Sequence, residues 1–217
     1  MQLLFIIALV FPLLLTGCLN FDAQPDPTRY YLLNSIDPSY SHKEFPIAYN
    51  LDIGVKSIKF PEHLDTPRMA TLSAKNEITY SEFNRWATPL KVGSGKVLAK
   101  NLSILFESDT ITSAPWSGCN KPEHLICLEI ESFIVNSCEC EVSLDAVWSF
   151  INKDYPDSNS GKRISIKRNY LGHPEDYRAI TEAMSDALAE LSYQIASDIS
   201  NTTLGSYSKD LDDEELI

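Results

Sequence analysis

The stretch EVSLDAVWSFI, residues 141–151, carries the clearest strand pattern in the chain. Apolar side chains alternate with mostly polar ones, so that one face holds Val142, Leu144, Ala146, Trp148 and Phe150. Successive side chains of a β-strand point to opposite faces of the sheet, and a period of two therefore predicts a strand with one buried face. The fold should be organised around a sheet that is covered on that face.

More strands are predicted on both sides of this stretch. Residues 125–135 form a second long β-like run, which is close enough in sequence to pair with 141–151 as a hairpin. Branched and aromatic residues bounded by turn-forming ones indicate the others. These strands are expected at 29–33, 51–58, 68–72, 77–81 and 162–170, with the turn-prone residues 73–76 joining 68–72 to 77–81 as a hairpin.

Two segments have helical periodicity instead. For the first, Thr88 is expected to be the N-cap and Pro89 the first helical residue, where the missing N–H costs nothing. The second is predicted from about 174 to 200, with Pro174, Glu175 and Asp176 in its first turn. Its stripe of apolar residues should cover one face of the sheet. The stripe comprises Tyr177, Ile180, Met184, Ala187, Leu188, Leu191, Ile195 and Ile199.

The N-terminus has the features of an export signal. The apolar run from Leu3 to Leu15 is about 13 residues long, short of the ~20 needed to cross a bilayer. The residues Leu15-Thr16-Gly17-Cys18 resemble a bacterial lipobox, in which the signal is cut before the Cys and its thiol receives a diacylglycerol. No Lys or Arg precedes the apolar run, which departs from the usual signal. We expect a signal peptide at 1–17, lipidation of Cys18 and a linker to residue 28.

Several consequences follow from that expectation. The chain would enter an oxidising compartment and stay attached to a membrane by its N-terminal lipid anchor. Leu19, rather than Asp, follows the Cys; by resemblance to Gram-negative lipoproteins, this favours the outer membrane, with the domain facing the periplasm. Residues 29–200 are enough for one domain.

The charge of the chain limits its partners. Its formal net charge is −12 at pH 7, which repels phosphate backbones and argues against nucleic-acid binding. Part of that charge lies in residues 201–217, which are predicted to form a solvated, flexible acidic tail.

The sequence shows no pattern typical of an enzyme, and none that calls for a cofactor. His42, His63, His124 and His173 are scattered, without metal-ligand or triad spacing, and no Gly-x-Ser-x-Gly elbow is present. The segment Gly93-Ser94-Gly95-Lys96 lacks the spacing of a phosphate loop and falls inside the first predicted helix. We therefore expect no catalytic residues and no metal site.

Four cysteines follow Cys18, namely Cys119, Cys127, Cys138 and Cys140. In an oxidising compartment cysteines more often pair, so at least one disulfide is predicted; free thiols and a zinc site are the alternatives. Three pairings are compatible with the sequence. If 125–151 form a hairpin, the geometry favours Cys119 with Cys127.

Two pairs of aromatic residues complete the candidates. Trp86 and Trp148 are expected in the core rather than in a lipid groove. Tyr30 and Tyr31 straddle the two faces of an edge-like strand, so one of them would point outward towards a partner.

Short segments along the chain resemble, in order and spacing, the ABC-type transport auxiliary lipoprotein family, which includes the lipoprotein of the paraquat-inducible system. The resemblance extends from Cys18 to about Ser200 and ends with the amphipathic helix. The matching residues are Cys18, Tyr30, Tyr31, Leu32, Leu33, Ile53, Gly54, Val55, Pro61, Leu64, Pro67, Arg68, Tyr80, Arg85, Trp86, Ala87, Pro89, Leu90, Leu98, Asn101, Leu102, Leu144, Ala146 and Trp148.

The resemblance implies an α/β domain with a mixed β-sheet packed by helices, similar to the N-terminal domain of TolB. It also implies a homo-oligomeric ring that works with the MCE-domain (mammalian cell entry) and permease proteins of a lipid transport system. The acidic tail and the four extra cysteines depart from the family. The alternative function is a structural lipoprotein in envelope assembly or secretion, and an envelope enzyme such as an esterase ranks third.

Overall fold

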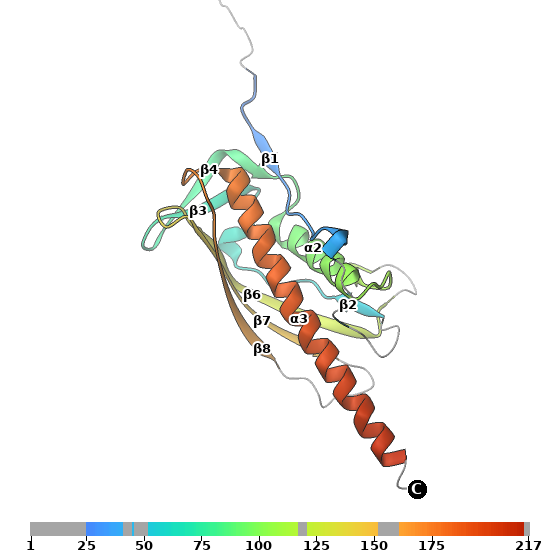
Figure 1. Cartoon of the computed structure of the whole chain (residues 1–217). Helices are drawn as coiled ribbons and strands as arrows, with labels where there is room; N and C mark the ends of the chain where they lie inside the picture. Colours follow the sequence, from blue (N-terminus) through green and yellow to red (C-terminus); the bar gives the residue numbers. More distant parts are fainter. Residues whose placement is uncertain (1–24, 41–44, 46–51, 117–120, 152–160, 215–217) are drawn as a thin grey trace, which may run out of the picture.

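The computed structural model describes residues 25–40, 45, 52–116, 121–151 and 161–214, with side chains described as far as Asn201. Cys18 and Cys119 lie outside the described residues, as does the predicted signal peptide. Within the described part the fold is α/β: an 8-stranded mixed sheet with two long helices against one of its faces (Figure 1). The predicted fold class is confirmed.

Three long antiparallel strands form one side of the sheet. They are β6 (His124–Asn136), β7 (Glu141–Ile151) and β8 (Lys162–Asn169). The predicted hairpin is present, with Leu128 opposite Trp148, and β8 then pairs with β7 so that Leu144 lies opposite Ile166. Burial alternates along β7 as the sequence pattern requires.

The other edge of β6 is shared by two different segments. At its start, β2 (Ile53–Val55) runs parallel to it, and at its end β3 (Arg68–Ala74) does so, with Leu72 opposite Asn136. Between them, the backbone of Lys59 donates to Leu128 O over 3.1 Å and accepts from Ile130 N over 2.9 Å. The edge of β6 is therefore hydrogen-bonded at both ends and in the middle.

The sheet continues beyond β3 and β2 and ends in two short strands. β4 (Glu77–Trp86) pairs with β3, β1 (Arg29–Tyr31) lies outside β4, and β5 (Thr112–Ser113) lies outside β2. The predicted 68–81 hairpin is confirmed, but both of its strands are longer than expected. Asn76 has a φ of 73° in the turn, a conformation that Asn tolerates better than most residues. β1 and β2 are shorter than predicted.

Helix α2 (Leu90–Leu105) follows β4 directly. The prediction that Thr88 caps it is wrong by one residue. Pro89 has a ψ of 130°, which is extended rather than helical, so Pro89 is the cap residue and the first helical bond runs from Gly93 N to Pro89 O. The segment Gly93-Ser94-Gly95-Lys96 lies within this helix.

Helix α3 (Tyr177–Glu214) crosses the sheet and extends past it (Figure 1). It begins at Tyr177 rather than Pro174, because Asp176 is the N-cap: its Oδ1 accepts hydrogen bonds from the backbone N–H groups of Arg178 (3.1 Å) and Ala179 (3.2 Å). The expectation of a tail without regular structure from residue 201 also differs from the structure. A helix that is already nucleated extends at little cost, and no Pro follows Pro174 to stop it before Glu214.

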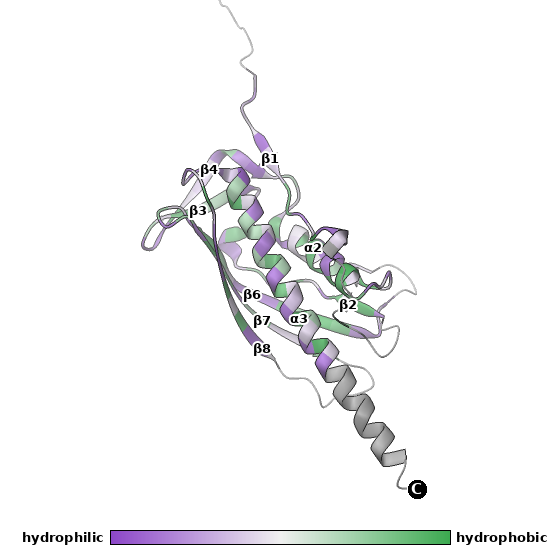
Figure 2. Ribbon diagram, viewed as in Figure 1, coloured by the Kyte–Doolittle hydropathy of each residue, from purple (hydrophilic) through white to green (hydrophobic). Residues whose placement is uncertain are grey.

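The core lies between the sheet and the two helices. Inward side chains of β6 and β7 meet the apolar stripe of α3, and Figure 2 shows hydrophobic residues concentrated along these strands. Trp86 and Trp148 both belong to this core, as predicted. One buried polar residue links three segments: Asn101 of α2 donates to Ser192 Oγ of α3 over 3.0 Å and accepts from Ile36 N over 2.9 Å.

Ion pairs hold the edge strand β8 on both of its faces. Arg163 pairs with Glu131, and Lys167 with Glu141, on the open face of the sheet; Lys162 and Arg168 pair with Asp198 and Glu190 of α3. The hydrogen bond that Lys167 donates to the Glu141 carboxylate raises the pKa of Lys167. Each exposed pair contributes little to stability, but charged side chains on an edge strand oppose unwanted strand pairing.

Candidate functional site

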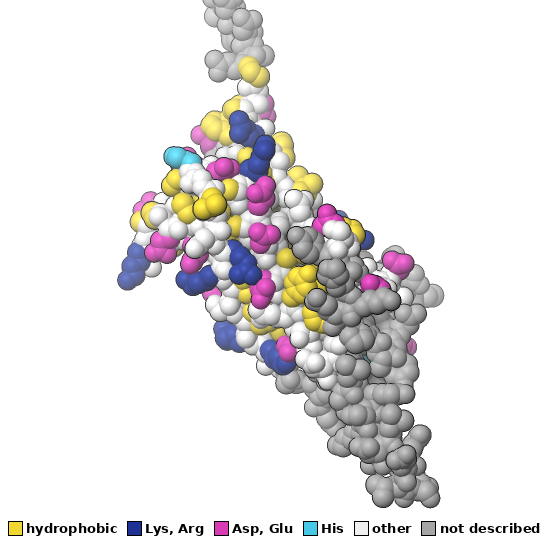
Figure 3. Space-filling view, viewed as in Figure 1, with side chains coloured by type: hydrophobic (Ala, Val, Ile, Leu, Met, Phe, Trp, Pro, Cys, Tyr) yellow, Lys and Arg dark blue, Asp and Glu magenta, His cyan; other side chains and the backbone are white. Residues whose placement is uncertain are grey.

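A shallow hollow lies at the end of the domain where the N-terminal linker enters. We call it the linker-end hollow. Side chains from the linker, from β1 and β4, and from the start of α3 form its lining, at the upper end of the molecule in Figure 1. Figure 3 shows apolar and charged side chains interspersed there. The lining residues are Pro27, Arg29, Tyr30, Tyr31, Phe83, Asn84, His173, Glu175, Asp176, Tyr177 and Arg178.

The two tyrosines of β1 differ in their surroundings. Tyr31 packs against the core, its hydroxyl donates to Asn84 Oδ1 over 3.1 Å, and its ring centroid lies 6.3 Å from that of Tyr177. Tyr30 points the other way and is 65% exposed. The sequence predicted that one of the pair would face outward, and the structure shows that it is Tyr30.

The linker is ordered where it meets the sheet. The carboxylate of Asp26 accepts a hydrogen bond from Thr28 N over 2.9 Å, and hydrogen bonds from Thr28 hold the pKa of Asp26 below its usual value. Arg85 of β4, which lies opposite Tyr30, lowers it further by charge attraction. The linker therefore approaches β1 along a defined path.

The polar groups of α3 that line the hollow are engaged in holding the helix start. Asp176 caps the helix, and its N–H donates to His173 O over 2.8 Å. His173 Nδ1 accepts a hydrogen bond from Glu175 N over 3.2 Å. In the neutral imidazole this arrangement puts the proton on Nε2. In front of them, Tyr170 donates its hydroxyl proton to Pro174 O over 3.0 Å. This network suits a rigid binding surface.

The cysteine cluster differs from its prediction. Cys127, Cys138 and Cys140 are free thiols, so no disulfide joins any two of these three residues. The favoured pairing of Cys127 with Cys119 involves a residue outside the described part of the chain. Cys127 is eleven residues before Cys138, and a strand rises about 3.3 Å per residue, so the two lie too far apart to bond.

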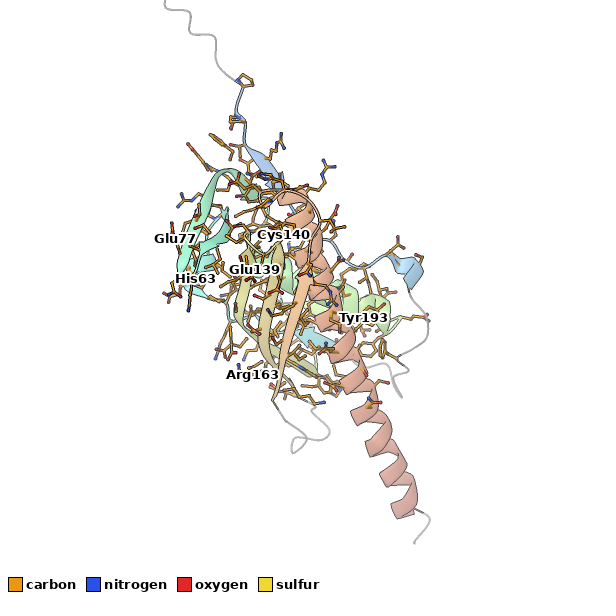
Figure 4. The ribbon with its side chains drawn as sticks, turned by 60° about the vertical axis from the view of Figure 1, so that its left-hand side comes forward. His63, Glu77, Glu139, Cys140, Arg163 and Tyr193 are labelled. Atoms are coloured by element: carbon orange, nitrogen blue, oxygen red, sulfur yellow. The ribbon has the colours of Figure 1, made fainter. Side chains whose placement is uncertain are left out.

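At the β6–β7 turn, the thiols of Cys138 and Cys140 have different partners. Cys138 Sγ donates to Ser73 O over 3.1 Å and Cys140 Sγ to Ser137 O over 3.8 Å (Figure 4 labels Cys140). Cys140 also lies beside Tyr170. Burial raises the pKa of Tyr170 to about 12, and Cys140 contributes to that increase.

The remaining sequence candidates are dispersed. Among the described residues, no three His, Cys, Asp or Glu side chains gather at metal-binding distances. Two exposed apolar residues were not singled out from the sequence: Phe83, which lines the hollow, and Leu171, two residues before His173. Isolated apolar residues in turns and on edge strands give no periodic signal, so only the structure could identify them.

Comparison with known proteins agrees with this fold. The family model of the ABC-type transport auxiliary lipoprotein component matches residues 31–196. The chain therefore belongs to this family of lipoproteins. A comparison with curated proteins finds no match. No helix in the described part of the chain is both long and apolar enough to cross a bilayer.

Two crystal structures share the fold. One is of a Xanthomonas campestris protein of the DUF330 family, with 12% identity and a TM-score of 0.62, covering 85% of this chain and 99% of that one. The other is of an uncharacterised protein, with 15% identity and a TM-score of 0.62, covering 79% of this chain and 98% of that one. At these identities the likeness shows the fold alone.

Proposed function

We propose that this protein is a non-enzymatic outer-membrane lipoprotein that serves an MCE-type ABC lipid transport system by binding its protein components. The observation that carries the proposal is the family match over residues 31–196, together with Leu15-Thr16-Gly17-Cys18 ahead of it. Diacylglycerol on Cys18 would hold the mature chain on the periplasmic face of the outer membrane, the location that Leu19 favours. Two or three acyl chains provide durable anchoring.

The linker limits where such a protein can act. Residues 20–28 span at most ~30 Å when fully extended. Because they join the domain at β1, the linker end must stay close to the membrane surface. The domain would then receive transporter components that approach the membrane from the periplasm.

Two features support a role in binding rather than catalysis. Two of the ionisable groups of the linker-end hollow, His173 and Asp176, are already engaged with the backbone around the start of α3. The rest of the lining combines exposed aromatic rings with arginines, which suit contact with an adjoining surface, whether protein or lipid.

Affinity purification from membranes tests this function. A chain tagged after Ile217 should retain MCE-domain or permease proteins, identified by mass spectrometry, whereas a Cys18→Ser chain should lose both fatty-acid label and partners. The purified mature domain should also be larger than a monomer in solution. Recovery of secretion or assembly proteins instead, with envelope lipids unchanged on deletion, would favour a structural lipoprotein of the envelope.

A further inference from the structure

Two exposed aromatic side chains line the linker-end hollow, and a third exposed apolar residue lies close to a lining residue in sequence. Tyr30 of β1 is 65% exposed, Phe83 of β4 is 44% exposed, and Leu171, in the connection from β8 to α3, is 92% exposed. Tyr30 and Phe83 both line the hollow, and Leu171 lies two residues before His173, which lines it as well. The backbone of Gly172, with a φ of 127°, turns the chain immediately after Leu171.

The charges of the hollow differ from those of the whole chain. The formal charge of the chain is −12, but in the lining Arg29 and Arg178 balance Glu175 and Asp176. Asp176 also neutralises the positive end of the α3 dipole by capping it. This end of an acidic protein is therefore close to neutral, so an anionic membrane surface would not repel it, and both arginines can pair with lipid phosphates.

We infer that the linker end of the domain itself rests on the lipid surface, with the aromatic rings of Tyr30 and Phe83 and the side chain of Leu171 at the headgroup level. This inference rests on the membrane anchor at Cys18 proposed above. Tyrosine is enriched at membrane interfaces because its ring is apolar and its hydroxyl remains hydrated. The linker keeps these side chains within reach of the bilayer at all times. The lipid surface, rather than a protein, would then cover this end.

The shape of the site favours lipid over a protein partner. The centre of a protein interface is normally apolar and closely packed, with a polar rim. Here the lining is mixed: Arg29, Asn84 and Glu175 share the hollow with exposed aromatic rings, and its lining residues form no closely packed apolar centre. Hydrated headgroups can fill such a hollow while the exposed apolar side chains enter the boundary with the acyl chains.

Fluorescence quenching on vesicles tests the inference without requiring lipidation. Residues 19–217, carrying an N-terminal hexahistidine tag in place of the lipidated Cys, are tethered by nickel-chelating lipid to phosphatidylethanolamine–phosphatidylglycerol vesicles with acyl chains brominated near the headgroup. Trp replaces Leu171 in one variant and Ile151 in its control. Ile151 is also exposed, but it ends β7, far from the linker end.

The inference predicts extra quenching for Leu171→Trp and none for Ile151→Trp. After removal of the tether, Tyr30→Asp combined with Leu171→Asp should weaken residual vesicle binding by about a hundredfold, since each of the two buried side chains contributes about a factor of ten. Circular dichroism checks that the Trp variants and the double Asp variant fold.

Equal quenching at the two positions would overturn the inference, as would acidic substitutions that change the oligomeric state but not vesicle binding. Failure of lipidation at Cys18 would refute the anchor and leave this test unaffected.

Discussion

The linker end and the body of the domain are built in contrasting ways. The body, meaning β6, β7 and β8 with α2 and α3, has long registered strands, an alternating core and a paired charge on every cation of β8. The linker end has a three-residue strand, exposed aromatic side chains and polar groups that hold one helix start. Stability is therefore concentrated in the body, while the surface available for binding is concentrated at the linker end.

Removing a phenylalanine ring should therefore lower the free energy of unfolding far more in the body than at the linker end. Phe133→Ala in the body removes a ring that is 1% exposed and should lower the free energy of unfolding by about 3–5 kcal/mol. Phe83→Ala at the linker end should change it by less than about 1 kcal/mol. Urea denaturation of both variants measures the contrast. Similar losses would mean that the linker end shares fully in the core.

The buried hydrogen bonds of Asn101 should also stabilise the body. Asn101→Ala leaves the partly buried N–H of Ile36 without its acceptor and should cost about 2 kcal/mol, because an unsatisfied donor keeps its desolvation penalty. Ser192→Ala, which removes the hydroxyl that accepts from Asn101, is the matched variant. If the double variant costs as much as the two singles added together, the two side chains are not coupled.

Tyr170 joins the two regions and predicts a pH dependence. Its folded-state pKa of about 12 lies above the ordinary value of 10.0, so its contribution to stability is complete below pH 10 and is lost as pH rises towards 12. The loss should be on the order of 2 kcal/mol. Tyr170→Phe should be less stable at pH 7 by about 1 kcal/mol, through loss of the bond to Pro174, and should lack this part of the alkaline decline. An unchanged pH profile in the variant would show that another group titrates.

The smallest effect is expected at the start of α3. Asp176→Ala removes the N-cap of the helix and should cost about 1 kcal/mol. Glu175→Ala, one residue earlier, keeps the cap and should change stability by less than half of that. Thermal unfolding in parallel compares them. Equal effects would show that general charge, rather than capping, stabilises the helix start.

The sequence predicted the body better than the linker end, for a physical reason. Alternation in 141–151 and the stripe of α3 arise from burial, which leaves a repeated pattern. The cap at Asp176, the break at Pro89 and the exposure of Leu171 depend on single backbone torsions and on neighbours distant in sequence. The cysteine prediction rested on compartment and spacing and is not shown at the three described positions, where the strand rise along β6 separates Cys127 from the turn.

Amide hydrogen exchange of the mature lipoprotein, compared between its own membranes and detergent, tests most directly whether the linker end is the binding surface. Membranes should slow exchange in β1 and in residues 171–178, while β7 and β8 should exchange equally slowly in both conditions. Protection confined to the open face of β7 and β8, with β1 and 171–178 unchanged, would contradict it and place the binding surface on the body.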